Sequence, residues 1–312
     1  MLGPTASGKS ELGLAIAERF RGEIVNYDSV QLYRGFDVGS AKTPISQRRG
    51  VPHHLIDVAD PDQLLSAGEY ARRSRSVVAE ISSRGVVPIL VGGTGFYLRA
   101  LTEGLFAGPG RDERLRERLE ESRRRRGAGY LHRVLSRLDP RSAGRIHPND
   151  APKLIRAIEV CLLAKAPMSS LLREGLEPLE GFEIVRLGLD PPRGQLYERI
   201  NLRARRMFEQ GLVEECRSLL AAGVSRDARP FGSLGYKQTI ELLDSKIDEA
   251  QAIKATAQAT RRYAKRQLTW FRPEPDVRRF EGFGDDPAVI ASAVEHVERA
   301  IAFEADGAPG SH

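Results

Sequence analysis

A glycine-rich stretch close to the start of the chain limits the fold more than any other feature. Residues 3–10 read GPTASGKS, which fits the pattern G-x-x-x-x-G-K-[ST] of loops that hold phosphate groups. In such a loop the backbone N–H groups point inward, the lysine adds positive charge, and the serine hydroxyl can ligate Mg²⁺. These loops join a buried strand to a helix, so the pattern predicts a parallel α/β sheet.

Very little chain precedes this loop. Only Met1 and Leu2 come before Gly3, whereas a strand usually runs about five or six residues. Either the first strand is strongly shortened, or the true start of translation lies upstream of Met1. We favour the second interpretation, in which upstream apolar residues complete the strand.

The segments after the loop alternate between helix and strand patterns. Residues 11–20 place apolar side chains at helical spacing, and GEIVNYDS is a short apolar strand that ends at Asp28. Residues 86–91 form another apolar run, followed by a Gly-Gly-Thr-Gly turn that contains Thr94. Because ligands bind at the carboxyl ends of parallel strands, we expect Asp28 and Thr94 to lie beside the loop.

The middle of the chain has a different character. Residues 111–133 contain nine arginines and five acidic residues, and no convincing strand occurs from there to about residue 181. We therefore predict an α/β fold in which a P-loop parallel sheet core is flanked by helices and interrupted by an inserted helical domain. The predicted boundaries are 1–110 and 181–302 for the core, 111–180 for the insertion and 303–312 for a disordered tail; further core elements are a strand over 182–190, helices over 193–222 and 250–271, and a strand over 277–280.

Composition narrows the class of protein. The net charge is +6, which is compatible with a polyanionic partner. Cys161 and Cys216 lie far apart, so the sequence indicates neither a zinc site nor a disulfide framework, and a reducing cytoplasmic setting is expected. A membrane span needs an apolar run of about 18 residues, and the sequence has none.

Asp28 is the main candidate for chemistry at a strand end. It could ligate magnesium in an ATPase or a kinase, act as a general base in a transferase, or merely cap the end of the strand. Gln31 lies close to it in sequence, and a glutamine amide can read an adenine edge through paired hydrogen bonds.

Two later segments have features of nucleic-acid binding. Residues 254–272 contain six basic residues and no acidic one, which is typical either of a solvated helix face or of a surface that neutralises RNA phosphates. Residues 231–238 add Tyr236 and Lys237 in a predicted loop, where the ring could stack on an unpaired base. The aromatic residues of the basic segment are Tyr263, Trp270 and Phe271.

Taken together, these stretches resemble the tRNA dimethylallyltransferases, also called isopentenyl-tRNA transferases. The resemblance covers nearly the whole chain in order, and GPTASGK, DSVQLYRG and KRQLTWFR are its most specific parts. Further matching stretches are HHLIDV, VGGTGFYLRAL, RIHPNDAPKLIRAIEV and GYKQ. The sequence departs from the family pattern in its short first strand. It also lacks a C-terminal zinc finger, as do the bacterial-type members.

The resemblance implies an activity and a set of catalytic residues. It implies transfer of a dimethylallyl group from dimethylallyl diphosphate to N6 of adenosine 37 in tRNA, with release of diphosphate. Asp28 would be the general base, and Thr94 would help to align the reacting groups. Ser10 would ligate the cofactor Mg²⁺, and the loop would hold the diphosphate rather than ATP. The implied diphosphate-binding residues are Gly3, Pro4, Thr5, Ala6, Ser7, Gly8, Lys9, Ser10 and Arg203.

The resemblance also implies contacts with the anticodon loop of tRNA. We expect a cytoplasmic, monomeric enzyme that does not bind membranes. The predicted tRNA-binding residues are Asp28, Ser29, Val30, Gln31, Thr94, Arg116, Pro152, Lys153, Leu154, Ile155, Arg156, Tyr236, Lys237 and Gln238.

Three alternatives remain open at this point. A P-loop kinase for a small molecule would bind ATP and would have no use for the basic segment. A prenyltransferase for free adenine nucleotides would tolerate loss of the helical insertion. A non-enzymatic RNA-binding module is the third, and the intact loop together with Asp28 argues against it.

Overall fold

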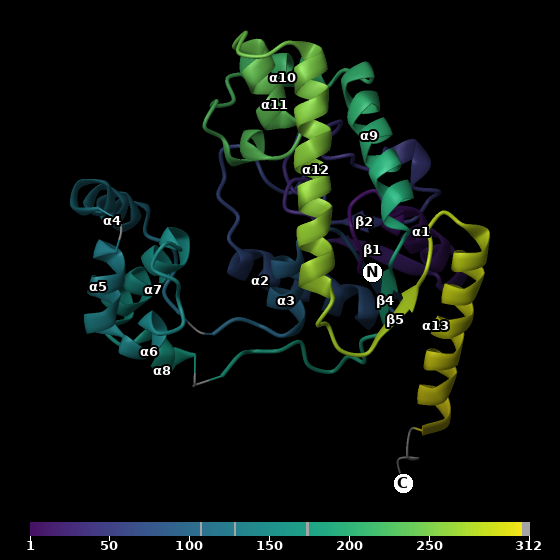
Figure 1. The fold of residues 1–312 in the computed structure, drawn as a ribbon. Coiled ribbons are helices and arrows are strands. Elements are labelled where there is room, and N and C mark those ends of the chain that lie inside the picture. Colours follow the sequence, from purple (N-terminus) through teal and green to yellow (C-terminus); the bar gives the residue numbers. More distant parts are fainter. Residues whose placement is uncertain (107, 128, 173–174, 308–312) are drawn as a thin grey trace. The chain divides into compact units, whose positions relative to one another are not determined.

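The computed structural model describes residues 1–106, 108–127, 129–172 and 175–307 (Figure 1). It is a mixed α/β structure that divides into two compact units. One comprises Met1–Leu101 and Gly181–His312, and the other comprises Thr102–Glu180. The second unit therefore starts at residue 102, earlier than the predicted boundary at 111.

All the strands of the described residues belong to the first unit, and they pair in parallel as the loop motif predicts. The strand order in the first sheet is β2-β1-β3, and a second sheet pairs β4 with β5. Strand β1 ends at Asn26, two residues before the predicted end at Asp28. The strands are β1 (Gly22–Asn26), β2 (His53–His54), β3 (Val87–Val91), β4 (Arg186–Leu189) and β5 (Val277–Phe280).

Met1 and Leu2 occupy the place of a strand between β3 and β4. The N–H of Leu2 donates to the carbonyl of Leu187 at 2.7 Å, and the N–H of Leu189 donates to the carbonyl of Leu2 at 2.9 Å. The amino group of Met1 donates to the carbonyl of Leu90 in β3 at 2.9 Å. This two-residue strand, which is a single parallel bridge between Leu2 and Gly188, connects the two sheets and places the loop that follows it at their carboxyl edge.

Two long helices and one hydrophobic cluster stabilise this sheet region. Helix α1 (Lys9–Phe20) and helix α13 (Pro287–Gly307) contribute to the same cluster as β1, β3, β4 and β5. Helix α13 continues to residue 307, so residues 303–307 of the predicted disordered tail are helical, and the rest of that tail lies outside the described residues. Helices α2 (Ala67–Ser83) and α3 (Gly95–Thr102) pack together through stacked rings of Tyr70 and Tyr97, 4.4 Å apart.

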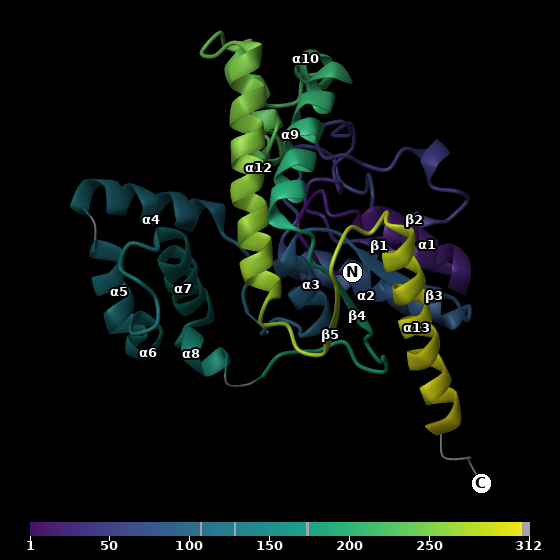
Figure 2. The ribbon, with the colours of Figure 1, turned by 45° about the vertical axis from the view of Figure 1, so that its right-hand side comes forward.

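A helical layer follows β4 in the first unit. Helices α9 (Arg193–Glu209) and α12 (Glu249–Phe271) lie side by side, as Figures 1 and 2 show. The helix predicted over 193–222 is wrong as one element, because it breaks at Gly211, whose φ of 94° suits glycine. The shorter elements are η1 (Ile45–Gln47), α10 (Leu212–Ala221), η2 (Arg229–Gly232) and α11 (Tyr236–Leu243).

The described part of the second unit is helical, as expected for the insertion. Aspartates cap three of its helices: Asp112 accepts the N–H of Leu115 at 2.9 Å, Asp139 accepts that of Ser142 at 3.0 Å, and Asp150 accepts that of Lys153 at 3.3 Å. Its core is a cluster of leucine and isoleucine side chains around Leu135 and Ile158. The helices are α4 (Glu113–Arg126), α5 (Tyr130–Leu138), α6 (Pro140–Ala143), α7 (Ala151–Ala164) and α8 (Met168–Leu171).

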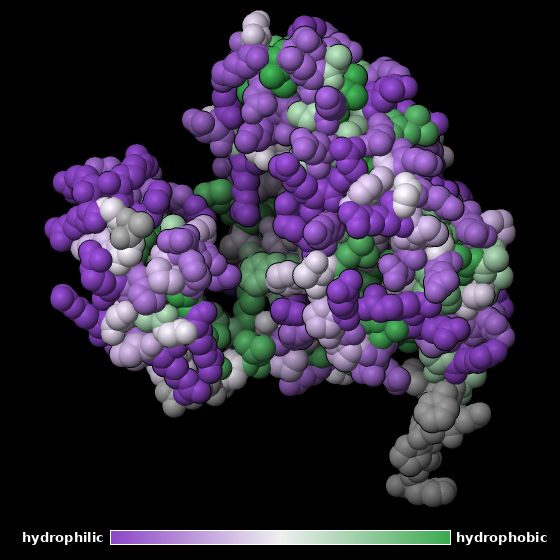
Figure 3. All heavy atoms as spheres, viewed as in Figure 1, coloured by the Kyte–Doolittle hydropathy of each residue, from purple (hydrophilic) through white to green (hydrophobic). Residues whose placement is uncertain are grey.

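The face shown in Figure 3 is largely polar. Hydrophilic residues cover much of α4 and of the helical layer that contains α10 and α11 in the view of Figure 3. Within the described residues, no helix combines the length and apolar character needed to cross a membrane.

Candidate active site

The phosphate loop leaves the two-residue strand and ends at α1. Gly8 has a φ of 87°, and a side chain there would bring its Cβ to 2.7 Å from the backbone nitrogen of Gly284. The N–H of Gly284 donates to the carbonyl of Ser7 at 2.8 Å. The loop before α13 therefore supports the phosphate loop from behind, and only glycine permits that approach.

Lys9 is buried in the loop without a carboxylate on its ammonium group. Its Nζ donates to the carbonyls of Gly3 at 3.0 Å and Pro4 at 2.7 Å, and the residue is 9% exposed. Burial, together with the nearby Arg203 guanidinium, lowers the pKa of Lys9 to about 7. Within the described residues Lys9 forms no ion pair, so its charge is available to a bound anion.

Arg203 reaches the same loop from α9. Its guanidinium donates to the hydroxyl of Thr5 at 3.4 Å, and burial lowers the pKa of this side chain. The negative charge of Asp28 opposes that lowering in both Arg203 and Lys9. Two cations and one carboxylate therefore share a partly enclosed site. The positive charges outnumber the negative one, and a diphosphate would balance the difference.

Two adjoining cavities meet at this point. The larger, of about 940 Å³, is lined by loop residues 5–10 and by Asp28 and Arg203. The smaller, of about 310 Å³, lies between α9 and α12 and has apolar walls that include Ile200 and Met207. Thr5, Asp28, Ser40, Arg203 and Tyr263 line both cavities. The arrangement offers a phosphate site and a less polar site on either side of Asp28.

Asp28 uses one carboxylate oxygen to fix its own orientation. Oδ1 accepts the N–H of Val30 at 2.9 Å and that of Gln31 at 3.4 Å. Within the described residues Oδ2 forms no hydrogen bond, and a Cβ at Gly93 would lie 3.4 Å from it. The cap interpretation and the catalytic interpretation are thus compatible, because one oxygen caps the turn and the other faces the cavities.

Thr94 lies beside Asp28 through hydrogen bonds to the next residue. Its Oγ1 accepts the N–H of Ser29 at 3.0 Å and donates to the Ser29 hydroxyl at 3.1 Å. The N–H of Thr94 donates to the carbonyl of Tyr27 at 3.3 Å. The structure therefore brings together the loop, Arg203, Asp28 and Thr94, which are distant in sequence.

The site also contains a plausible oxygen ligand for Mg²⁺. Ser10 is exposed at the start of α1 and lines the larger cavity together with Asp28. The described residues contain no group of three or more His, Cys, Asp or Glu side chains that could enclose a metal ion.

Comparisons with known proteins give a consistent result. A family model described as IPP transferase matches residues 31–274. The tRNA dimethylallyltransferase of Koribacter versatilis is 58% identical over 298 residues, which cover 96% of this chain and 97% of that protein. The chain belongs to the tRNA dimethylallyltransferase family.

Further relatives and solved structures agree with this assignment. The tRNA dimethylallyltransferase of Solibacter usitatus is 53% identical over 95% of this chain and 96% of its own length. The crystal structure of the full-length tRNA isopentenylpyrophosphate transferase from Bacillus halodurans is 37% identical, with a TM-score of 0.70 over 96% of this chain and 94% of that one. A eukaryotic dimethylallyltransferase acting on tRNA gives a TM-score of 0.79 at 25% identity, over 98% and 77% of the two chains.

Two residues of the 231–238 stretch that were predicted to contact tRNA are buried in the structure. Tyr236 is fully buried in α11, not in a loop, and its hydroxyl donates to Glu215 at 2.5 Å. Gln238 is also buried, and its side chain accepts the N–H of Gly235 at 2.9 Å. A buried ring cannot stack on a base, whereas Lys237 is exposed and stays a predicted contact.

In the second unit, Arg116 and Arg156 stay predicted contacts, although both bind a carboxylate of the same unit. Arg116 forms a two-point ion pair with the fully buried Glu159, at 2.8 and 2.9 Å, and Arg156 donates to the same carboxylate at 2.7 Å. Leu154 and Ile155 are buried in the helical core, so they are unavailable to RNA. Of the predicted stretch, the exposed Pro152 and Lys153 and the half-exposed Arg156 remain predicted contacts.

Gln31 is more constrained than its sequence position suggests. Its Nε2 donates to the carbonyls of Ser40 at 3.1 Å and Ala41 at 3.3 Å. The donor half of the amide is therefore already used within the protein, which disagrees with paired hydrogen bonds to an adenine edge.

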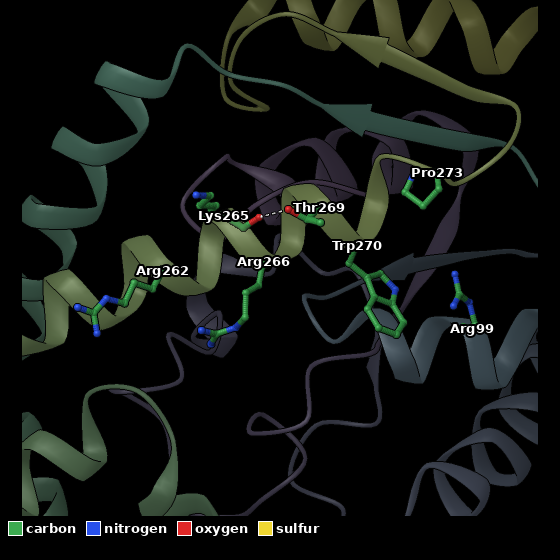
Figure 4. Close-up of a pocket in the computed structure, with 7 residues that line it drawn as sticks. All are labelled: Arg99, Arg262, Lys265, Arg266, Thr269, Trp270 and Pro273. Atoms are coloured by element: carbon green, nitrogen blue, oxygen red, sulfur yellow. Dashed lines mark hydrogen bonds between the residues drawn. The ribbon is translucent and has the colours of Figure 1, made fainter. Parts of the chain in front are cut away.

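A basic pocket of about 690 Å³ lies on α12 (Figure 4). Arg262, Arg266 and Trp270 are spaced by four residues and extend from the same side of the helix. The guanidinium of Arg99 lies over the Trp270 ring, 4.8 Å from its centre. Sequence reasoning missed Arg99, and its only signal was a basic residue in the helix after the Gly-Gly-Thr-Gly turn.

Proposed function

We propose that this chain transfers a dimethylallyl group from dimethylallyl diphosphate to N6 of adenosine 37 in tRNA and releases diphosphate. The observation that supports the proposal most is the pair of adjoining cavities, which meet at Asp28. One has a phosphate loop and two cations, and the other has apolar walls that suit a small hydrocarbon group. We further propose a cytoplasmic monomer, because tRNA is the substrate and residues of one chain line both cavities.

Lys9, Arg203 and the loop N–H groups would stabilise the departing diphosphate. The C1–O bond of the allylic substrate breaks while negative charge grows on the leaving oxygen, and fixed donors lower the energy of that state. Ser10 and the diphosphate oxygens would hold Mg²⁺, which when bound supplies further charge neutralisation. No hydrolysis of ATP is needed for this reaction.

Asp28 would take up the proton that N6 loses. The bond from N6 to C1 forms as the exocyclic amine attacks, and its proton passes to Oδ2, which is free of other hydrogen bonds within the described residues. The backbone N–H groups at Oδ1 fix the carboxylate and keep it from rotating. A positioned base of this kind contributes roughly 10²–10⁴-fold to a rate.

Adenosine 37 has to leave its stack to reach Asp28. Enzymes that act on a base in a structured nucleic acid commonly extrude it into a pocket. We propose that Arg262, Lys265 and Arg266 hold the RNA backbone meanwhile, since these exposed residues line one pocket and make no ion pair among the described residues.

The proposal is tested by incubating the protein with labelled dimethylallyl diphosphate and unmodified tRNA. We expect label in the tRNA, none in AMP, and negligible hydrolysis of ATP. Efficient labelling of AMP would indicate the prenyltransferase for free nucleotides. ATP turnover that tRNA stimulates, at rates matching any modification, would indicate a phosphotransferase.

Asp28→Asn tests the assigned role of the base. We expect kcat to fall by roughly 10²-fold or more while the affinities for both substrates change little, because the amide keeps the shape but cannot accept the proton. The measurement is kcat and both affinities across a magnesium titration. Loss of diphosphate binding with recovery at high Mg²⁺ would instead make Asp28 a metal ligand.

A further inference from the structure

Gln267 is a buried polar residue that connects the two halves of the site. It lies on α12 and is 4% exposed. Its Oε1 accepts the N–H of Thr5 at 2.7 Å, and its Nε2 donates to the carbonyl of Gly93 at 2.8 Å. The partners settle the orientation of the amide, because a backbone N–H can only donate and a carbonyl can only accept.

Each partner of Gln267 belongs to a different part of the site. Thr5 is in the phosphate loop and accepts a hydrogen bond from Arg203. Gly93 directly precedes Thr94, whose hydroxyl binds Ser29, the residue next to Asp28. One amide group thus joins the loop for the leaving group to the segment that carries the proposed base.

Other atoms closely surround the contact between Gln267 and Gly93. A Cβ on Gly93 would lie 2.7 Å from Nε2 of Gln267 and 3.4 Å from Oδ2 of Asp28. The hydroxyl of Tyr263, one turn earlier on α12, also donates to the carbonyl of Gly93, at 2.9 Å. The Gly93 backbone is therefore held from α12 by two side chains, and a shift of Gln267 would move the neighbourhood of Asp28.

Resting on the proposed function, we propose that Gln267 is a positioning residue that sets the separation between the diphosphate and the acceptor nitrogen. The displacement requires C1 to lie between the leaving oxygen and N6, in line with both. An error of about 1 Å in such an arrangement can reduce a rate by about 10²-fold. Gln267 touches neither reacting atom; it acts through Thr5 and Gly93.

The alternative is that Gln267 only stabilises the fold. A buried amide is costly unless its hydrogen bonds are made, and an apolar side chain of similar size can replace such a group at little cost. Stability and catalysis therefore respond differently to the same substitution, and that difference separates the two roles.

The test compares Gln267→Met and Gln267→Glu with Gln258→Met, which changes an exposed residue of the same helix. Methionine loses both hydrogen bonds, and an ionised glutamate cannot donate to Gly93. We expect kcat to fall by about 10–100-fold in both Gln267 variants. The affinities for dimethylallyl diphosphate and for tRNA should change by less than about threefold. Gln258→Met should match the wild type.

Three outcomes would contradict the proposal in distinguishable ways. A Gln267 variant with wild-type kcat overturns the positioning role and leaves the proposed function intact. The positioning role is also overturned if the variant has a lowered melting temperature and its rate per folded molecule, counted by single-turnover titration, equals that of the wild type. A wild-type protein that transfers no label from dimethylallyl diphosphate to tRNA overturns the proposed function and the role of Gln267 together.

Discussion

Helices α4 and α12 are both rich in arginine, but their charges have different surroundings. In α4, Arg123 and Arg125 form ion pairs with Glu120 and Glu121, and Arg116 pairs with the buried Glu159. Among the described residues, the Arg262, Lys265 and Arg266 side chains of α12 make no ion pair. The comparison shows that the partner of each cation, and not the number of cations, distinguishes a structural helix from a candidate binding surface.

The sequence of each helix accounts for the difference. Helix α4 places acidic residues three or four positions from its arginines, where side chains on a helix surface meet. Helix α12 has one acidic residue, Glu249, at its first position. Its later cations therefore keep mobile counterions, and RNA phosphates that displace those ions gain affinity by releasing them.

Substitution of Lys9 should give the largest effect and extends the comparison to buried cations. Lys9 is held by carbonyls alone, whereas Arg116 is held by a carboxylate. We expect Lys9→Met to lower kcat/KM by about 10²–10³-fold, since one fixed donor to the leaving group is lost. The melting temperature should stay equal or rise, because a buried charge has been removed. Steady-state kinetics and thermal unfolding measure both, and a large loss of stability would make Lys9 a structural residue like Arg116.

Substitution of Glu159 should give the opposite pattern. Glu159→Gln would leave Arg116 and Arg156 without their shared carboxylate, and we expect a loss of about 3 kcal/mol in the free energy of unfolding. The pKa of Glu159 is lowered chiefly by hydrogen bonds from these two arginines, against the effect of burial, so the carboxylate is ionised at neutral pH. Urea unfolding followed by circular dichroism checks the loss. Unchanged stability with weakened tRNA binding would show that the two arginines act as RNA contacts.

Neutralising matched sets of charges on the two helices should give smaller, graded effects. Combined Arg262→Gln, Lys265→Gln and Arg266→Gln substitutions should weaken tRNA binding and reduce the slope of log affinity against log salt concentration by about 0.7–0.9 per lost phosphate contact. The matched set on α4, Arg123→Gln, Arg124→Gln and Arg125→Gln, should leave that slope nearly unchanged. Filter binding over a salt series measures both sets, and equal slopes for the two triple variants would remove the distinction drawn here.

The sequence alone predicts the parts of the fold that depend on local pattern. The spacing of glycines, lysine and serine in residues 3–10 predicts the loop, α1 and the parallel sheet. The strand ends near Asp28 and Thr94 follow from apolar runs that stop at polar residues. The role of Met1 and Leu2 does not follow, because their hydrogen bonds are made to residues of β3 and β4 far along the chain.

Side-chain contacts account for what the sequence does not predict at the candidate site. Tyr236 and Lys237 are neighbours in sequence, but they begin a helix that turns one inward and leaves the other exposed. In the sequence, Arg116 is one of many arginines. Its carboxylate partner lies 43 residues later, so the ion pair cannot be predicted from local spacing. Gln267 lies in the matching stretch KRQLTWFR, but that pattern does not reveal its two hydrogen bonds, because a glutamine in a basic helix is compatible with full exposure.

The two-residue strand also decides when the site can form during synthesis. Leu2 pairs with Leu187 and Leu189, and the loop that follows it rests on Gly284. These partners leave the ribosome long after the loop does, although chains usually begin to fold from their N-terminal end. The loop thus acquires its native contacts only after these later residues have been made. A nascent chain that ends before Gly284 lacks a complete phosphate site.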